Sequence, residues 1–382
     1  MSPKAIVSCL KFSFVAVFLL FFQYAFSQNN FSRVDQWMHN NLKNLGSRAV
    51  LMVWKNGKIV YSNQYNEISP KQKLIGKFIA RKKGAYFNEL VKDLTTNTRE
   101  RIASCSKWLS AALVMTFVDE GKLSLNDSVG KYLPVMTINK KGKITIWQCL
   151  SHLTGIQSGS LRESIENMTK AQSMEEAINM IASLPMEGEP GKTFHYSNTG
   201  LQIAAAVVEK ISGKDFETLF AERIAKPLGL INTDFGKKKV PLAAGGAWST
   251  AEEYLKFLQM ILNEGAYNGK QILSKESIIA MQKNYLSANT VIAYSPSEAG
   301  NWGYGFGEWT MDNSIPTSSV TKGISTSQRS NSVTSPGLFG TFPWVNNEKK
   351  YCAILFTLNI NSEGRGERYK TLKKLVDQAV SK

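Results

Sequence analysis

Serine and lysine three residues apart form the first pair in this sequence that could carry out chemistry. A serine hydroxyl becomes a nucleophile when a base lies within hydrogen-bond reach, and residues three apart share one face of a helix. The Ser-x-x-Lys pattern occurs at Ser8/Lys11, Ser104/Lys107, Ser128/Lys131 and Ser319/Lys322. Of these serines, only Ser104 opens a strong amphipathic helical pattern, so we take Ser104 and Lys107 as the candidate pair.

Ser104 also has a purely structural explanation. The residues that follow repeat at a helical period, at Leu109, Ala112, Leu113, Thr116 and Phe117, and Gly121 lies where a left-handed cap is expected. A serine ahead of a helix can be its N-cap, with the hydroxyl accepting a hydrogen bond from a free N–H. Lys107 favours the catalytic alternative, because the positive end of a helix lowers the proton affinity of a lysine in its first turn.

Tyrosine and asparagine two residues apart form a second pattern with chemical potential. A tyrosine of depressed pKa beside a lysine can move a proton between nucleophile and leaving group. The Tyr-x-Asn pattern occurs at Tyr61/Asn63, Tyr86/Asn88 and Tyr196/Asn198. Tyr196 follows a Pro-Gly turn and precedes a helical pattern, which suits a loop that faces a cleft. Asn198 as the N-cap of that helix is the alternative, and we interpret His195 as structural.

The elements that must position these residues begin and end with strands. Two β-forming runs on either side of Asn56-Gly57 predict a hairpin over residues 48–65. Strand patterns return late in the chain, and a polar helical pattern follows them, at residues 302–311, 338–345, 351–358 and 367–380. We therefore expect strands from both ends of the chain to form one sheet.

Helices are predicted between these strands. Helical patterns cover residues 199–211, closed by Gly213, and 251–262, opened by Ser249 or Thr250. This order predicts an α/β (α+β) architecture in which a cleft lies where two domains meet. The two are a discontinuous sheet domain of residues 28–103 and 236–382 and a mainly helical domain of residues 104–235.

The N-terminal segment and the composition limit the setting in which the protein works. In residues 1–27, Lys4 and Lys11 precede an apolar run, Phe12 to Phe22, and the small residues Ala25 and Ser27 follow it. This pattern predicts a cleaved signal peptide and a periplasmic or secreted protein. The run is shorter than the roughly 20 residues that span a bilayer, so we expect no stable membrane anchor. The chain carries a net charge of +16, spread thinly, with its densest run from Lys71 to Lys83.

Cysteine and histidine usage argues against a metal or a disulfide framework. Beyond the N-terminal segment the chain has Cys105, Cys149 and Cys352, an odd number without a close pair, and three histidines without ligand spacing. We predict no metal and no cofactor. We expect a small-molecule or peptide substrate, which a cell wall could supply, and not nucleic acid as the partner of an exported chain.

Several stretches together resemble one family, the serine β-lactamase-related hydrolases, which include class C β-lactamases, DD-peptidases and family VIII esterase-like enzymes. They occur in order at residues 101–107, 119–125, 131–134, 144–155, 194–200, 226–230 and 243–246. The resemblance implies a β-lactamase/transpeptidase-like fold, with a mostly antiparallel sheet flanked by helices and an inserted all-α domain. It implies Ser104 as nucleophile, Lys107 as base, Tyr196 as proton shuttle and Asn198 as a hydrogen-bond partner of the substrate amide.

The third motif of that family is where this sequence departs. Family members carry Lys-Thr-Gly or His-x-Gly on the strand that lines the cleft. Here Ser335-Pro336-Gly337 is the preferred match, and Ser332-Val333-Thr334 is the alternative, three residues earlier. Neither contains a cation, so we expect weaker recognition of a β-lactam carboxylate. In the preferred match, the resemblance implies substrate contacts from Ser335 and Gly337 and an oxyanion hole formed by the N–H groups of Ser104 and Leu338.

These observations predict an exported serine hydrolase that forms an acyl-enzyme on Ser104 and cleaves an ester, amide or β-lactam bond. The altered third motif favours an esterase or peptide amidase over an efficient β-lactamase. The alternative is a penicillin- or peptide-binding protein or sensor that is acylated without efficient turnover. Cys105, next to Ser104, is either a small buried side chain or a thiol that oxidation could use to block the cleft.

Overall fold

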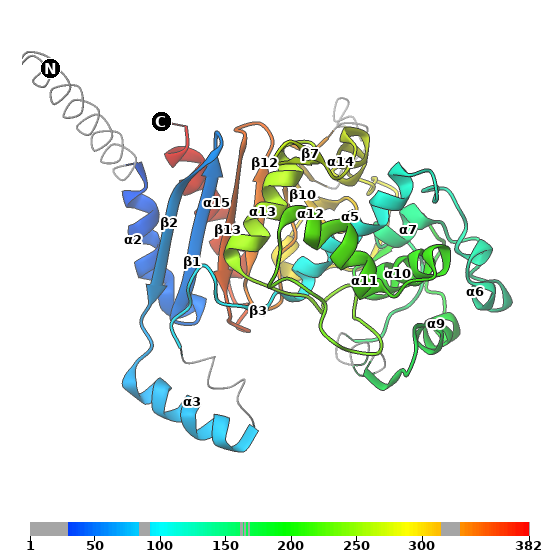
Figure 1. The fold of residues 1–382 in the computed structure, drawn as a ribbon, viewed down its shortest axis with the longest axis horizontal. Coiled ribbons are helices and arrows are strands. Elements are labelled where there is room, and N and C mark those ends of the chain that lie inside the picture. The colour runs from blue at the N-terminus through cyan, green and yellow to red at the C-terminus, as the bar shows by residue number, and fades with distance from the viewer. Residues whose placement is uncertain are drawn as a thin grey trace, which may run out of the picture.

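One antiparallel sheet unites the two ends of the chain (Figure 1). The structure, a computed structural model, describes residues 30–83, 92–160, 163, 166, 169–314 and 329–381. Within them seven strands pair in the order β2-β1-β13-β12-β11-β10-β9. Their bounds are β1 Arg48–Lys55, β2 Lys58–Asn66, β9 Trp302–Tyr304, β10 Trp309–Ser314, β11 Ser332–Thr334, β12 Phe342–Asn346 and β13 Tyr351–Thr357. The predicted fold class is confirmed.

The central strands carry apolar side chains toward both faces of the sheet. On β13, Ile354 belongs to one hydrophobic core and its neighbour Ala353 to the other, because successive residues of a strand point to opposite faces. Helix α13 (Ala251–Leu262) covers the first face, and helices α2 (Ser32–Asn41) and α15 (Arg365–Ala379) cover the second (Figure 1). With both faces covered, every residue of β13 is buried.

Local sequence signals placed several elements correctly. The hairpin of β1 and β2 turns at Asn56 and Gly57, both of which have positive φ. Helix α10 (Thr199–Ser212) ends at Gly213 in the left-handed conformation. Helix α13 begins after Thr250, whose side chain accepts a hydrogen bond from the backbone N–H of Glu253.

Two of the late strand predictions need correction. The pattern at 302–311 is two strands, β9 and β10, because a turn that contains Gly307, with φ +74°, separates them. The pattern at 338–345 begins too early, because the N–H of Gly340 donates to the carbonyl of Gly337 at 2.9 Å and closes a turn ahead of β12. Both turns matter for the site described below.

Helix α5 (Ser106–Asp119) lies in the interior of the protein. The predicted helix is therefore present, but all residues from Ser106 to Phe117 are buried, so the prediction that it is amphipathic is wrong. Its polar side chains have internal partners instead: Ser110 Oγ donates to the carbonyl of Ala243 at 2.6 Å, and Thr116 Oγ1 donates to that of Leu113 at 2.7 Å. A helix that is enclosed on all sides holds whatever stands at its first turn in a fixed position.

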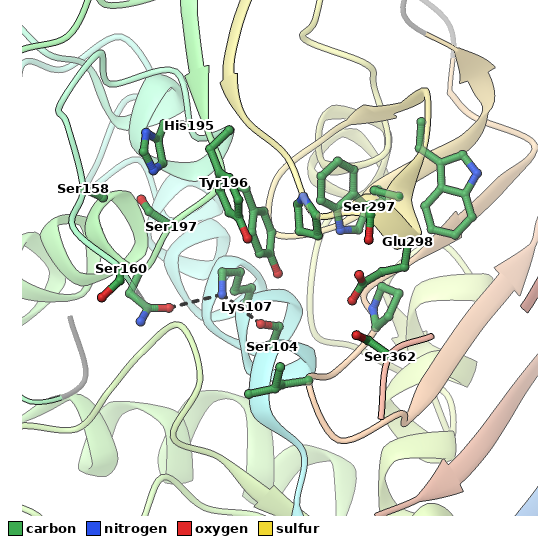
Figure 2. Close-up of a pocket in the computed structure, with 18 of the residues that line it drawn as sticks. Ser104, Lys107, Ser158, Ser160, His195, Tyr196, Ser197, Ser297, Glu298 and Ser362 are labelled. Atoms are coloured by element: carbon green, nitrogen blue, oxygen red, sulfur yellow. Dashed lines mark hydrogen bonds between the residues drawn. The ribbon is translucent and has the colours of Figure 1, made fainter. Parts of the chain in front are cut away.

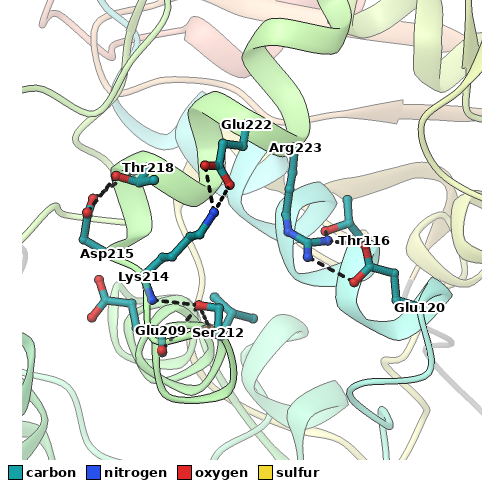
Figure 3. Close-up of polar contacts among 10 residues, drawn as sticks. Thr116, Glu120, Glu209, Ser212, Lys214, Asp215, Thr218, Glu222 and Arg223 are labelled. Carbon is teal, nitrogen blue, oxygen red and sulfur yellow. Dashed lines mark hydrogen bonds and ion pairs between the residues drawn. The ribbon is translucent and has the colours of Figure 1, made fainter.

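The far end of α5 is held by an arginine from the helical part of the molecule. Arg223, in the π-helical turn Ala221–Ala225, donates to both carboxylate oxygens of Glu120, at 2.8 and 3.0 Å (Figure 3). Its guanidinium also lies 4.1 Å from the ring centre of Phe117. Hydrogen bonds from Arg223 lower the pKa of Glu120 to about 2, so the pair stays charged at neutral pH.

The remaining elements are helices α3 and α9 and a set of shorter helices, turns and strands. They are η1 Leu42–Leu45, α3 Pro70–Lys83, β3 Glu100–Arg101, η2 Ala103–Cys105, η3 Val129–Lys131, α6 Pro134–Ile138, α7 Ile146–Leu150, α9 Met174–Ser183, β4 Thr193–His195, α11 Phe216–Phe220, η4 Ala221–Ala225, α12 Lys226–Leu228, β5 Trp248–Ser249, β6 Ala266–Tyr267, β7 Lys270–Gln271, α14 Lys275–Met281, β8 Val291–Tyr294 and η5 Ser297–Ala299. In the described part of the chain, no helix combines the length and apolar character needed to cross a membrane. The predicted domain boundaries stay a prediction, and the signal-peptide prediction lies outside the described residues.

Gly307→Ala is expected to lower the free energy of unfolding by more than Gly121→Ala. Both glycines have positive φ, +74° and +66°, so each alanine carries the strain of a left-handed residue, about 1 to 3 kcal/mol. Only at Gly307 would a Cβ meet other atoms, at 2.4 Å from the carbonyl oxygen of Lys107 and 2.8 Å from Cβ of Ala111. Urea denaturation of both variants measures the difference. Equal losses would show that this contact with α5 does not limit stability.

Candidate active site

Ser104 stands at the head of the buried helix, where it faces a cavity. It lies in the 3-10 turn Ala103–Cys105, which begins with Ala103 at φ +45°, a strained conformation. Its neighbour Cys105 is fully buried, whereas Ser104 is partly exposed and lines a cavity of about 670 Å³. The N-cap position of α5 is Cys105, and no side chain caps the helix there. The N-cap explanation of Ser104 is therefore wrong.

Lys107 is buried directly beneath the Ser104 hydroxyl. Its Nζ lies 3.2 Å from Ser104 Oγ, 2.8 Å from the carbonyl oxygen of Ala244 and 3.4 Å from Asn198 Oδ1 (Figure 2). Only 1% of the residue is exposed, and burial lowers its pKa from 10.5 to about 7. The sequence predicted this direction, but from the helix end, whereas the cause is removal of the amine from water.

The neutral form of Lys107 fits its surroundings. A neutral amine has two N–H donors and one lone pair. The two donors match the oxygens of Ala244 and Asn198, and the lone pair is then free to accept the proton of Ser104. A candidate base must lie within hydrogen-bond reach of the proton it takes, and this arrangement meets that requirement.

Tyr196 approaches Ser104 from the opposite wall. It follows β4, and its backbone N–H donates to the carbonyl of Tyr294 at 3.0 Å. Burial raises the pKa of the Tyr196 hydroxyl, and the nearby Ser104 side chain lowers it by less, so the net change is upward. The expectation of a depressed tyrosine pKa is therefore wrong, because the desolvation of the phenolate outweighs its neighbours. Tyr196 is a proton donor in this state.

Asn198 and His195 complete this wall of the cavity. Asn198 occupies the N-cap position of α10 without a capping bond from its side chain, and its Oδ1 accepts from Lys107. His195 lies 2.6 Å from Glu187, measured from Nδ1 to Oε1, and also lines the cavity. The side chain of Asn198 thus serves the buried lysine instead of the helix end.

A second histidine supports Tyr196 from behind, and sequence reasoning missed it. His152 is buried with φ +59°, its Nε2 lies 3.0 Å from the Tyr304 hydroxyl, and its ring centre is 4.8 Å from that of Tyr196. Burial and the nearby Lys107 keep its pKa well below the ordinary value, so the ring is neutral. The only sequence signal was its place in the 144–155 segment.

The third motif packs against the turn that carries Ser104, through the backbone of Gly337 and the buried hydroxyl of Ser335. Ser335 Oγ donates to the carbonyl oxygens of Ser104, at 3.2 Å, and Gly307, at 2.9 Å. A Cβ on Gly337 would lie 2.4 Å from the carbonyl oxygen of Ile102, so only glycine fits there. Ser335 and Gly337 therefore pack behind the nucleophile, while Leu338 lines the cavity. Their predicted contacts with substrate stay predictions.

The alternative register of the third motif lies farther along the strand. Ser332-Val333-Thr334 forms β11, where Ser332 pairs with Asn346 of β12, and Thr334 Oγ1 donates to the carbonyl of Pro343 at 2.6 Å. The contacts of Ser335 with Ser104 favour the preferred register. Of the other Ser-x-x-Lys pairs, Lys131 forms an ion pair with Asp127, and those at Ser8 and Ser319 lie outside the described residues, as does Tyr86/Asn88.

Cys105 is a packed side chain. It is fully buried, its Sγ lies 3.8 Å from the carbonyl oxygen of Thr341, and burial raises its thiol pKa. A thiol in this environment stays protonated and unreactive. Over the described ranges, no group of three or more His, Cys, Asp or Glu side chains is arranged to hold a metal ion.

The chain is similar to a known protein family, to several curated proteins and to solved structures. A family model described as Beta-lactamase matches residues 40–379. Protein Rv1367c of Mycobacterium tuberculosis is 26% identical over 351 residues, which cover 78% of this chain and 80% of that protein. The N-acetylmuramyl-L-alanine amidase of Bacillus subtilis is 26% identical over 216 residues, 54% of this chain and 47% of the amidase. The solved structure of a candidate beta-lactamase from Bacteroides dorei is 25% identical in sequence and superposes with a TM-score of 0.74. The alignment covers 92% of this chain and 99% of the Bacteroides chain.

The reactivity of Ser104 is expected to rise with pH through about 7. The neutral amine of Lys107 is the form that accepts the serine proton, and this form gains population as the pH passes the lowered lysine pKa. A fluorophosphonate labels reactive serines, and its labelling rate can be measured over a pH range that brackets this pKa, from about 5 to about 9. The rate should rise with pH and then reach a plateau. Lys107→Met should slow labelling and remove the inflection. An unchanged inflection in this variant would assign the base to another group.

Proposed function

The chain belongs to the beta-lactamase family, and from this we propose that it is a serine hydrolase that acts through an acyl-enzyme on Ser104. The fold is that of the family's serine hydrolases. The observation that carries the proposal is the buried Lys107 amine, 3.2 Å from Ser104 Oγ with its pKa lowered to about 7. A lysine held in this way can act as a base at neutral pH.

In the proposed acylation, Ser104 Oγ attacks the carbonyl carbon of the substrate and its proton passes to Nζ of Lys107. Tyr196, whose hydroxyl stays protonated because burial raises its pKa, donates its proton to the leaving group as the bond to that group breaks. The Lys107 ammonium then returns a proton to the Tyr196 oxygen, so both groups regain their starting forms. In deacylation, water takes the place of the leaving group: it gives up one proton as its oxygen bonds to the acyl carbon, the bond from that carbon to Ser104 Oγ breaks, and Oγ regains a proton.

The backbone around Leu338 supports the proposed oxyanion hole. The N–H of Gly337 is occupied by the carbonyl of Thr341 at 2.8 Å, and Arg365 holds the carbonyl of Leu338 at 3.0 Å. These bonds fix the orientation of the segment beside Ser104. The N–H groups of Ser104 and Leu338 are the pair that we propose for the developing negative charge.

An ester or amide bond is the proposed target. The Ser335-Pro336-Gly337 motif carries no cation, and Arg365 donates to three backbone carbonyls, so an anionic β-lactam group gains little in this cavity. The B. subtilis relative named as an amidase makes a cell-wall-derived amide one candidate. The same altered motif favours a second candidate, a penicillin- or peptide-binding protein that is acylated without efficient turnover.

We also propose that the protein is exported to the periplasm or secreted. The support is the pattern of residues 1–27, in which positive charge, an apolar run and small residues follow one another. The substrate would then be a small molecule or peptide of that compartment.

Mass spectrometry after incubation with an activated ester and, separately, with a β-lactam tests the proposal. We expect rapid turnover of the ester, and Ser104→Ala should reduce it by at least about a thousandfold because the nucleophile is lost. Ser128→Ala is the matched control, since Ser128 also belongs to a Ser-x-x-Lys pair but Lys131 pairs with Asp127. Retained turnover in Ser104→Ala would remove Ser104 from the mechanism. A persistent adduct on Ser104 without turnover would support the binding-protein candidate.

A further inference from the structure

A carboxylate that the proposed chemistry does not use faces the same cavity as Ser104. It belongs to Glu298, in the 3-10 turn Ser297–Ala299, and its side chain is 22% exposed. Figure 2 shows Glu298 and Ser362 on one side of Ser104, with Ser158, Ser160 and His195 on the other. Nothing in the local sequence pattern distinguishes Glu298 from a surface glutamate, so it was not among the predicted site residues.

Arg365 holds Glu298 from behind. One guanidinium nitrogen lies 3.7 Å from Glu298 Oε1, and Arg365 itself is only 3% exposed. The guanidinium also donates to the carbonyl oxygens of Leu338, Asn359 and Asn361, at 3.0, 2.9 and 3.0 Å. Within this pair the cation is therefore engaged by backbone oxygens, while the carboxylate is the more exposed member.

The position of Glu298 is fixed by close packing. Helix α15 contacts the turn that carries Glu298, and a Cβ on Gly366 would lie 3.0 Å from the Glu298 carbonyl oxygen. This packing holds the backbone of Glu298, and the ion pair with Arg365 restricts its side chain, so the side chain loses less conformational freedom when a ligand binds. Glu298 is thus arranged in advance for a partner in the cavity.

The basic side chains in the described part of the cavity lining all have partners inside the protein. Lys107 is buried against Ser104 with its pKa lowered to about 7, and His195 is paired with Glu187. Arg365 is occluded as described above. An anionic substrate group would therefore meet the Glu298 carboxylate, whereas an ammonium group would gain a charge-assisted hydrogen bond from it.

We propose that Glu298 is a specificity-determining residue that binds an ammonium group of the substrate. The substrate class is then an ester or amide that carries a primary amine. This inference rests on the proposed serine hydrolase function, and it adds the chemical group by which the substrate is selected.

Three p-nitrophenyl esters of equal chain length, which end in an ammonium, a methyl or a carboxylate group, test this inference. We expect kcat/KM to fall in that order. Glu298→Gln keeps the shape of the side chain but removes its charge, so the ratio of kcat/KM for the ammonium ester to that for the methyl ester should fall about tenfold. A second series with the same groups on the leaving alcohol probes the other side of the scissile bond.

Glu363→Gln is the matched control. It removes a carboxylate from the exposed segment next to Ser362, outside the cavity lining, and should keep the wild-type ratio. A ratio of kcat/KM that Glu298→Gln leaves unchanged in both series would overturn the inference. A wild-type preference for the carboxylate ester would overturn it too, and would assign Arg365 as an anion site.

The failure of this inference and that of the proposed function have different signatures. Hydrolysis of all three esters at equal rates by an enzyme that depends on Ser104 overturns only the role of Glu298. No hydrolysis and no adduct with any ester overturns both. Inhibition by an alkylammonium ion, weakened about tenfold in Glu298→Gln, supports the inference independently of turnover.

Discussion

The burial of one amine, that of Lys107, is the constraint on which the rest of the site depends. A charged ammonium removed from water without a carboxylate partner is costly, so the environment favours the neutral form. That environment exists only because α5 is enclosed on every side, an unusual position for a helix whose first turn carries lysine and serines. The carbonyl of Ala244 and the amide of Asn198 then accept from the amine and leave its lone pair toward Ser104.

Close approaches of backbone to backbone keep Ser104 in place over this lysine. Gly307 and Gly337 come so near to the turn and first residues of α5 that neither has room for a Cβ. Ser335 adds hydrogen bonds to the carbonyls of Ser104 and Gly307. The strained φ of Ala103 is held by these contacts, as backbone strain at a reactive group generally is. The third motif therefore acts on the nucleophile's backbone even though it lacks a cation.

The sequence predicted what depends on short separations along the chain. Ser104 and Lys107 lie one helical turn apart, and Tyr196 and Asn198 lie just before one helix start, so motif, periodicity and the family resemblance together were enough to select them. The environment of α5 was not predictable in the same way, because its serines and threonine resemble an exposed face until their internal partners are known. The same applies to the pKa of Tyr196, which burial decides. Glu298 and Arg365 meet only through packing between distant segments, and no local pattern marks them.

The central pairing of the sheet also determines when in the life of the chain the site can exist. Strand β1 is completed on one edge by β13, and Thr357 Oγ1 donates to the carbonyl of Arg48, 309 residues earlier, at 3.1 Å. Contacts of such long sequence separation form late in folding, since the intervening chain must first be made and closed. A chain in which β13 has not yet paired has the nucleophile and its lysine but neither the finished sheet nor Arg365 behind the cavity. The order of assembly thus keeps the reactive serine without its complete cavity until the last strands have joined the sheet.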